Sequence, residues 1–225
     1  MSLRSPDKSM RPFTPLRTGL NLRANRALDV AQVGVARHWL ALANMGLAAV
    51  IVLSIVAPLL GSVGLVAEAS PIYQAYYAIC HQWPFRAFFL FGPSATYDAQ
   101  AIAAIAGPAE IWTFVGNDAT GFKMALCERD LAIFASALLM GSVYSRLRPR
   151  LSPPSVLLYL LLLIPIALDG FTQLPSWRES TWELRVSTGA ITGIATVWLL
   201  FPYLDILANQ TILASVGWEH AAPDS

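Results

Sequence analysis

Charged side chains are scarce in this sequence, and their scarcity decides the class of protein. Only 13% of the 225 residues are Asp, Glu, Lys or Arg, whereas 56% are hydrophobic. Soluble domains usually carry about 25% charged residues. The formal net charge is +1, so no strong positive field favours nucleic acid as a partner. The composition therefore predicts an integral membrane protein.

Cysteine is equally scarce, and the familiar reaction motifs are absent. Cys80 and Cys127 are the only two cysteines, which excludes a disulfide-rich scaffold. The sequence contains no nucleophile elbow, no P-loop, no H-E-x-x-H and no C-x-x-C. It shows no internal repeat and no low-complexity tract either. No named enzyme class is indicated by motif alone.

Four apolar runs predict membrane-spanning helices, since the hydrocarbon core needs roughly 20 apolar residues in a helix. They cover residues 39–60, 130–144, 155–170 and 188–204. We expect the second helix to start upstream, near Phe122, and the third to kink at Pro165. The expected fold is an all-α membrane protein with four transmembrane helices, a four-helix bundle carrying a helical extracytoplasmic cap.

Basic residues set the predicted orientation of these spans. The segment before the first span and the loop between the second and third hold ten Lys or Arg residues, against five in the other loops. The positive-inside rule then predicts a multi-pass protein of the cytoplasmic (inner) membrane with both termini cytoplasmic. The cytoplasmic side is expected to carry only basic anchors. A basic cytoplasmic segment (1–37) precedes the membrane domain (38–207) with its outer cap loop (61–123), and a cytoplasmic tail (208–225) follows.

Four polar motifs fall on the predicted outer face. CHQWPFR (80–86) lies in the cap loop, CERD (127–130) leads into the second span, DGFTQ (169–173) closes the third and LRVSTG (184–189) opens the fourth. The residues that they bring to this face are Cys80, His81, Gln82, Arg86, Cys127, Glu128, Arg129, Asp130, Asp169, Gln173 and Arg185. We therefore expect an outward-facing polar site at the membrane surface.

The acidic residues of this set have both structural and functional interpretations. Glu128 and Asp130 sit near a predicted helix start, where they stabilise the helix dipole. Asp169 ends a helix at the lipid boundary, where an unpaired carboxylate is costly. Arg185 or Arg129 is its expected partner. A structural ion pair and a functional acid both remain open.

The ordered motifs resemble those of a family of small prokaryotic integral-membrane proteins of unknown function. The matching elements are C-H-Q-x-P-x-R, C-x-R-D, D-G-x-x-Q and L-R-x-x-T-G, within residues 72–200. The resemblance implies a membrane fold and brings no established reaction. Glu128, Ala132 and Phe134 depart from the small residue, the Gly and the Tyr expected from the family.

A disulfide between Cys80 and Cys127 is the first hypothesis for the cysteine pair. Both are predicted on the oxidising side of the membrane, where disulfides persist. Closing a loop of about 48 residues would stabilise the cap by roughly 4 kcal/mol. The protein is then a small structural or partner-binding subunit, accessory to a larger membrane complex. The small residues of GAITG (189–193) would serve close helix packing.

A metal site is the second hypothesis. Cys80, His81, Cys127 and a carboxylate, Asp169 or Glu128, form a ligand set suited to zinc or copper. Adjacent Cys and His residues do not share one helical face, so one of them need not be a ligand.

A thiol-dependent enzyme is the third hypothesis. His81, Arg86 or Arg129 would lower the pKa of a cysteine, and the pair would exchange electrons with a quinone or a dithiol. The same residues could instead act on a lipid-linked substrate, with arginines holding phosphate and His81 or Asp169 moving protons.

The leading interpretation is therefore a small membrane subunit with an outward Cys/His/Arg/Asp cluster, which includes the charged residues Asp169, Arg185, Asp130 and Arg129. The alternative is a metal- or thiol-dependent membrane enzyme using the same cluster, with His81, Arg86, Arg129 and Asp169 as catalytic candidates. Membrane lipid and a larger membrane complex are the expected partners.

Overall fold

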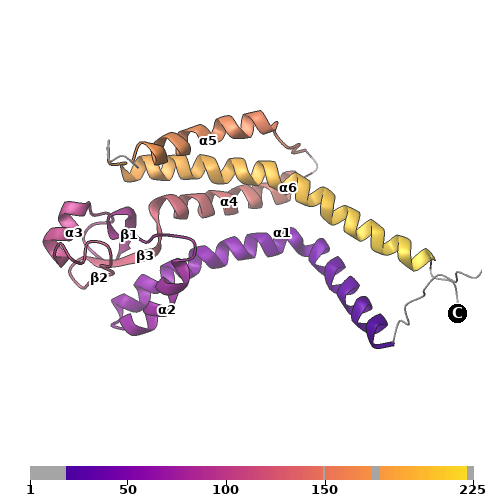
Figure 1. Ribbon diagram of the computed structural model, residues 1–225, viewed down its shortest axis with the longest axis horizontal. Helices are drawn as coiled ribbons and strands as arrows, with labels where there is room; N and C mark the ends of the chain where they lie inside the picture. The colour runs from indigo at the N-terminus through magenta and orange to yellow at the C-terminus, as the bar shows by residue number, and fades with distance from the viewer. Residues whose placement is uncertain (1–18, 149, 174–177, 222–225) are drawn as a thin grey trace, which may run out of the picture. The chain divides into compact units, whose positions relative to one another are not determined.

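The computed structural model describes residues 19–148, 150–173 and 178–221 (Figure 1). Residues 38–208 form one compact unit, and the two chain ends, 1–37 and 209–225, are grouped in a second. The described residues of the second unit are helical and belong to the ends of α1 (Gly19–Ser62) and α6 (Trp182–Ala221). Most of the predicted basic segment, residues 1–18, and the last four residues of the predicted tail lie outside the described residues.

The 38–208 unit is mostly helical, as the composition predicts. Its long helices are the 38–62 part of α1, α4 (Glu128–Leu147), α5 (Val156–Phe171) and the 182–208 part of α6, which run alongside one another (Figure 1). Among the residues that the structure describes, three segments are long and apolar enough to cross a membrane: Val30–Ser62, Glu128–Leu147 and Trp182–Ala214. Helix α5 is apolar but has only 16 residues, or about 24 Å of helix. Its length alone does not establish the predicted fourth crossing.

The cap at one end of this unit contains a β-sheet, which corrects the prediction of an all-α fold with a helical cap. Strands β1 (Ala87–Leu90), β2 (Gly116–Asn117) and β3 (Gly121–Cys127) form an antiparallel sheet in the order β1-β3-β2. Three helical segments surround it, namely α2 (Val66–Tyr76), the 3₁₀ turn η1 (Pro84–Arg86) and α3 (Ala99–Ala106). The cap is therefore of mixed α and β structure.

The central strand β3 explains this error. Every residue from Gly121 to Leu126 is buried. Ala125 and Leu126 pack with Tyr73 and Tyr76 of α2. A strand covered on both faces gives a continuous apolar run that cannot be distinguished from a buried helix by periodicity. The expected upstream start of the second span is therefore wrong, and α4 begins only at Glu128.

Small residues bring α4 and α6 into close contact. A Cβ built on Gly189 would lie 2.6 Å from the carbonyl oxygen of Arg129, and one on Gly193 would overlap Ser136 and the carbonyl of Ile133. Glycine at these positions of α6 lets the α4 backbone approach, as close helix packing requires. The spacing of GAITG thus serves packing, as predicted, and holds the first turn of α4 against the first turns of α6.

An acidic residue anchors the end of the bundle that lies away from the cap. Asp205 of α6 accepts hydrogen bonds from Trp39 Nε1 and Tyr144 Oη, each at 3.1 Å, and forms an ion pair with Arg148. This network joins α1, α4 and α6. The expectation that this side carries only basic anchors is therefore wrong, because Arg148 is paired rather than free.

Candidate functional site

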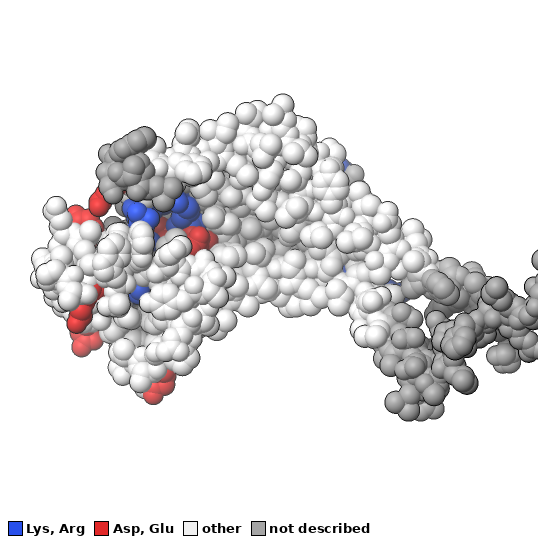
Figure 2. Space-filling model, viewed as in Figure 1, with Lys and Arg blue, Asp and Glu red and all other residues white. Residues whose placement is uncertain are grey.

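A cavity of about 950 Å³ opens where the cap meets α4, α5 and α6. Its walls include residues from all four polar motifs, so the topology brings together what the sequence separates by up to 105 positions, from residue 80 to residue 185. Figure 2 shows acidic and basic side chains gathered at this end of the molecule, whereas the visible surface of the helices is almost free of charge. The polar site predicted from the motifs is therefore a real concavity in the fold.

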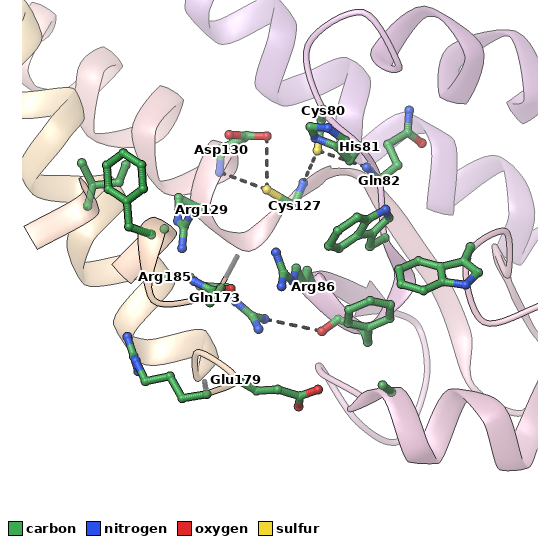
Figure 3. A pocket seen from close by; sticks show the side chains of 18 of the residues that line it. Cys80, His81, Gln82, Arg86, Cys127, Arg129, Asp130, Gln173, Glu179 and Arg185 are labelled. Atoms are coloured by element: carbon green, nitrogen blue, oxygen red, sulfur yellow. Dashed lines mark hydrogen bonds between the residues drawn. The ribbon is translucent and has the colours of Figure 1, made fainter. Parts of the chain in front are cut away.

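Two thiols and a carboxylate form the tightest group in this cavity. The side-chain ligand atoms of Cys80, Cys127 and Asp130 all lie within 4.8 Å of one another. Cys80 comes from the loop after α2, Cys127 ends β3, and Asp130 lies in the first turn of α4 (Figure 3). Cys127 Sγ lies 3.1 Å from Asp130 Oδ2. Both cysteines are free thiols, so no disulfide joins them.

Backbone N–H groups point at both sulfur atoms (Figure 3). Cys80 Sγ accepts from the N–H of Gln82 at 3.4 Å and from the N–H of Cys127 at 3.3 Å. Cys127 is the N-cap of α4, and its Sγ accepts from the N–H of Asp130 at 3.4 Å. Donors of this kind, together with a helix N-terminus, stabilise a thiolate relative to a thiol.

Gln82 shapes the loop that carries Cys80. Its φ angle is 54°, in the left-handed region that usually favours glycine. Its buried side chain donates to the carbonyl of Tyr73, and its own carbonyl accepts from the ammonium group of Lys123. These contacts hold the strained backbone in place and turn its N–H toward the sulfur. No role beyond polarity was predicted for Gln82 from the sequence, whereas in the structure it is a positioning residue.

The pKa values of the two thiols move in opposite directions. The pKa of Cys80 is lowered, chiefly by the hydrogen bond with the Cys127 thiol and with help from the N–H of Gln82. The pKa of Cys127 is raised because its thiol is bonded to Cys80, is buried, and lies near the charges of Cys80 and Asp130. Loss of the first proton is therefore easier than from an ordinary thiol, and loss of the second is harder.

His81 and Asp169, which the sequence places in the metal set, lie outside the cysteine group. His81 lines the same cavity but is exposed, and its ring lies 5.8 Å from that of Trp83. Asp169 is only 2% exposed and is fully occupied by other partners. Asp130 stands in the position predicted for a fourth ligand, because it lies one helical turn from Cys127.

Asp169 forms an ion-pair network at the end of α5. It pairs with Arg129 of α4 and, at 2.6 Å, with Arg178, and it also accepts from Gln173 Nε2 at 3.2 Å. Arg178 belongs to no motif and was missed by the sequence analysis, because a loop arginine carries no periodic signal. Arg185, the other expected partner of Asp169, pairs instead with Glu128 at 2.8 Å.

Arg86 has a different environment from the other arginines of the cavity. Its guanidinium lies 4.6 Å from the ring centroid of Trp83 and 5.8 Å from that of Phe85. It forms no ion pair with a carboxylate among the residues that the structure describes. Its pKa is lowered by burial and by the positive charges of Arg185 and Arg129.

Comparison with known proteins places the chain among membrane proteins. The family of predicted membrane proteins designated DUF2085 matches residues 118–199. This range begins just before β3 and ends within α6, so it contains Cys127, Asp130, Asp169 and Arg185 but not Cys80.

Two archaeal proteins are similar in sequence to parts of this chain. An uncharacterized protein of Methanocaldococcus jannaschii is 32% identical over 133 residues, which are 58% of this chain and 67% of that protein. An uncharacterized protein of Methanothermobacter thermautotrophicus is 43% identical over 75 residues, 33% of this chain and 67% of the relative. No solved structure matches the chain. The similarity shows that this chain belongs to the DUF2085 family of predicted membrane proteins.

Proposed function

We propose that this chain is a multi-pass cytoplasmic-membrane protein that binds one transition-metal ion between Cys80, Cys127 and Asp130. The observation that carries the proposal is the approach of two sulfurs and one carboxylate oxygen to within 4.8 Å of one another. Ligands around a tetrahedral zinc ion lie about 3–4 Å apart. Small side-chain rotations that move the ligand atoms by about one ångström would therefore bring all three into bonding distance of one ion.

The local structure indicates metal binding rather than a chance approach of the three side chains. Cys127 and Asp130 are separated by two residues, the spacing of the C-x₂-C pairs in zinc sites. Metal ligands must be deprotonated. The N–H groups aimed at Cys80 favour its thiolate, and the charge of the metal would have to displace the proton of Cys127, whose pKa is raised. Thiolate and carboxylate ligands together suit zinc, and copper is the other metal that thiolates select.

A metal site with three protein ligands leaves one coordination position for water or substrate, as in catalytic zinc sites. Here that position would face a large cavity, because the same three residues line its wall. The metal would supply Lewis-acid polarisation of a bound oxygen. This arrangement favours a metal-dependent activity at the membrane surface over a purely structural role.

Metal content of the purified full-length chain tests the proposal. We expect about one zinc or copper ion per chain, lost in Cys80→Ser, Cys127→Ser and Asp130→Asn. His81→Ala is the matched control, because His81 lines the same cavity outside the ligand group and should leave the metal content unchanged. A metal-free wild-type chain, or equal loss of metal in His81→Ala, would overturn the proposed ligand set.

An accessory membrane subunit clamped by a disulfide is the second candidate function, and the neighbouring sulfurs of Cys80 and Cys127 favour it. Oxidation of the two thiols would join the loop after α2 to the end of β3 and fix the cap on the bundle. Binding of a metal and formation of a disulfide use the same sulfurs and exclude one another. Peptide mapping without reductant therefore separates the two functions.

We propose four membrane crossings with the cap outside and both termini in the cytoplasm. The apolar surface of α5 supports its crossing beside α6, to which it is joined through Tyr159 and Thr196, whose hydroxyl oxygens lie 3.4 Å apart. Its exposed side chains are largely leucines, which suit contact with lipid. A tag at Ser225 should be protected from protease in intact cells, and cleavage there would refute this orientation.

A further inference from the structure

We infer that the arginine-lined side of the cavity binds a phosphate-bearing amphiphile, with Arg86 as its principal charged contact and the apolar wall of α5 against its tail. This site lies beside the cysteine group and is supported by different observations. It does not require the proposed metal.

The guanidinium group of Arg86 has the properties of an anion-binding group. Its charge is held against the faces of Trp83 and Phe85 rather than by a carboxylate. Its Nε is buried and has no hydrogen-bond partner among the described residues. A buried donor without a partner costs about 1–3 kcal/mol. A ligand oxygen in the cavity would remove this cost and neutralise the charge.

The neighbouring arginines reinforce the positive character of the cavity. Arg129 and Arg178 share one carboxylate, that of Asp169, so one positive charge of this trio is not neutralised. Arg185 is balanced by Glu128. The Nε atoms of Arg129 and Arg185 are also buried and unpartnered among the described residues. Figure 3 shows the side chains of Arg86, Arg129 and Arg185 reaching the same space from the cap, α4 and α6.

Two further acids line the cavity, and neither is paired with Arg86. Asp130 is turned toward the Cys127 thiol, and Glu179 is exposed. The charge of Glu179 raises the pKa of Arg86, but by less than burial and the charges of Arg185 and Arg129 lower it. Guanidinium groups match phosphate oxygens in paired hydrogen bonds. Several converging guanidiniums therefore favour a phosphate over a singly charged carboxylate.

The apolar walls determine the rest of the ligand. Ile166, Ala167 and Phe171 of α5 line one side, and Trp83 and Trp112 of the cap line the other. A volume of about 950 Å³ lies at the upper end for sites that enclose drug-sized molecules, far more than inorganic phosphate needs. Phe171, the last residue of α5, lines the cavity and is also 68% exposed. An acyl or prenyl tail could therefore leave the cavity along α5 into lipid.

Ligand-dependent thermal stabilisation of the full-length chain in detergent tests this inference. The probes are dioctanoyl phosphatidic acid, the uncharged dioctanoyl glycerol and inorganic phosphate. We expect phosphatidic acid alone to raise the melting temperature. Arg86→Gln should weaken its apparent affinity by roughly tenfold or more, the worth of a charged hydrogen bond. Arg146→Gln is the matched control, because Arg146 is exposed at the other end of α4.

Each alternative result has a defined meaning. Equal stabilisation by dioctanoyl glycerol, or unchanged affinity in Arg86→Gln, would overturn the anion site. Equal stabilisation by inorganic phosphate would keep the anion site and overturn the amphiphile. If Arg86→Gln does not fold, Arg86→Lys should still bind more weakly, because its ammonium group lacks the paired donors, and unchanged affinity there would overturn the role of Arg86. Metal content measured on the same samples should not change with Arg86, which separates this site from the metal site.

Discussion

Replacement of Asp169 by Asn is the most informative perturbation of the charged network. The carboxylate is 2% exposed and forms ion pairs with Arg129, which is 20% exposed, and with Arg178, which is 40% exposed. Loss of one partner from a buried ion pair costs about 3–5 kcal/mol, because the remaining charge is uncompensated. Both arginines retain some contact with solvent, so we expect about 2–4 kcal/mol of lost stability.

Reversible unfolding of the detergent-solubilised chain in increasing SDS measures this loss. Arg178→Gln is the control, because it removes the more exposed arginine and leaves Asp169 paired with Arg129. We expect it to cost no more than about 1 kcal/mol. The double variant Asp169→Asn with Arg129→Gln should recover part of the loss, since it removes a charge that the single variant leaves unpaired. A cost below about 0.5 kcal/mol for Asp169→Asn would refute the reasoning.

Three further perturbations test the packing, the buried charge and the distal anchor. Gly193→Ala should lower the free energy of unfolding by about 1–3 kcal/mol, since its Cβ overlaps α4, whereas Gly46→Ala, whose Cβ meets nothing within 4 Å, should not be destabilising. Burial lowers the pKa of Lys123 from 10.5 to about 8, so the unfolded chain binds more protons between these values and stability should rise with pH across this window. Below pH 8 the buried, protonated lysine lowers the free energy of unfolding by on the order of 3 kcal/mol. Melting temperatures at pH 7.5, 8.5 and 9.5 should therefore rise in the wild-type chain and not in Lys123→Met. Asp205→Asn should lose about 1–3 kcal/mol by the SDS assay, and a loss equal to that of Asp118→Asn, an exposed acid in the cap, would contradict its anchoring role.

The sequence was sufficient to predict the membrane class and the meeting of the polar motifs. Long apolar runs have few alternatives to membrane helices, and the predicted directions of these helices place the four motifs on one side of the bilayer. The motifs at Cys80, Cys127, Asp169 and Arg185 therefore had to approach one another once the topology was assigned. Their convergence on one cavity follows from this simple geometry.

The contacts within the site could not be predicted from the same information. Whether Asp169 or Glu128 pairs with Arg185 depends on the rotation of α4 and α6 about their axes, which is fixed by contacts such as that of Gly189 with the Arg129 carbonyl. The sheet was missed because its central strand has the composition of a buried helix. Asp130 replaced His81 beside the thiols because the left-handed backbone at Gln82 folds the chain back onto Cys80 and leaves His81 exposed.

A combined count of thiols and metal on gently purified wild-type protein tests the metal site most directly. The chain is denatured without reductant and in the presence of a chelator, alkylated and weighed intact, while a parallel sample is analysed for zinc and copper. We predict that both Cys80 and Cys127 are alkylated and that about one metal ion accompanies each chain. A chain without metal whose peptides show Cys80 joined to Cys127 would contradict the metal site and favour the clamped accessory subunit.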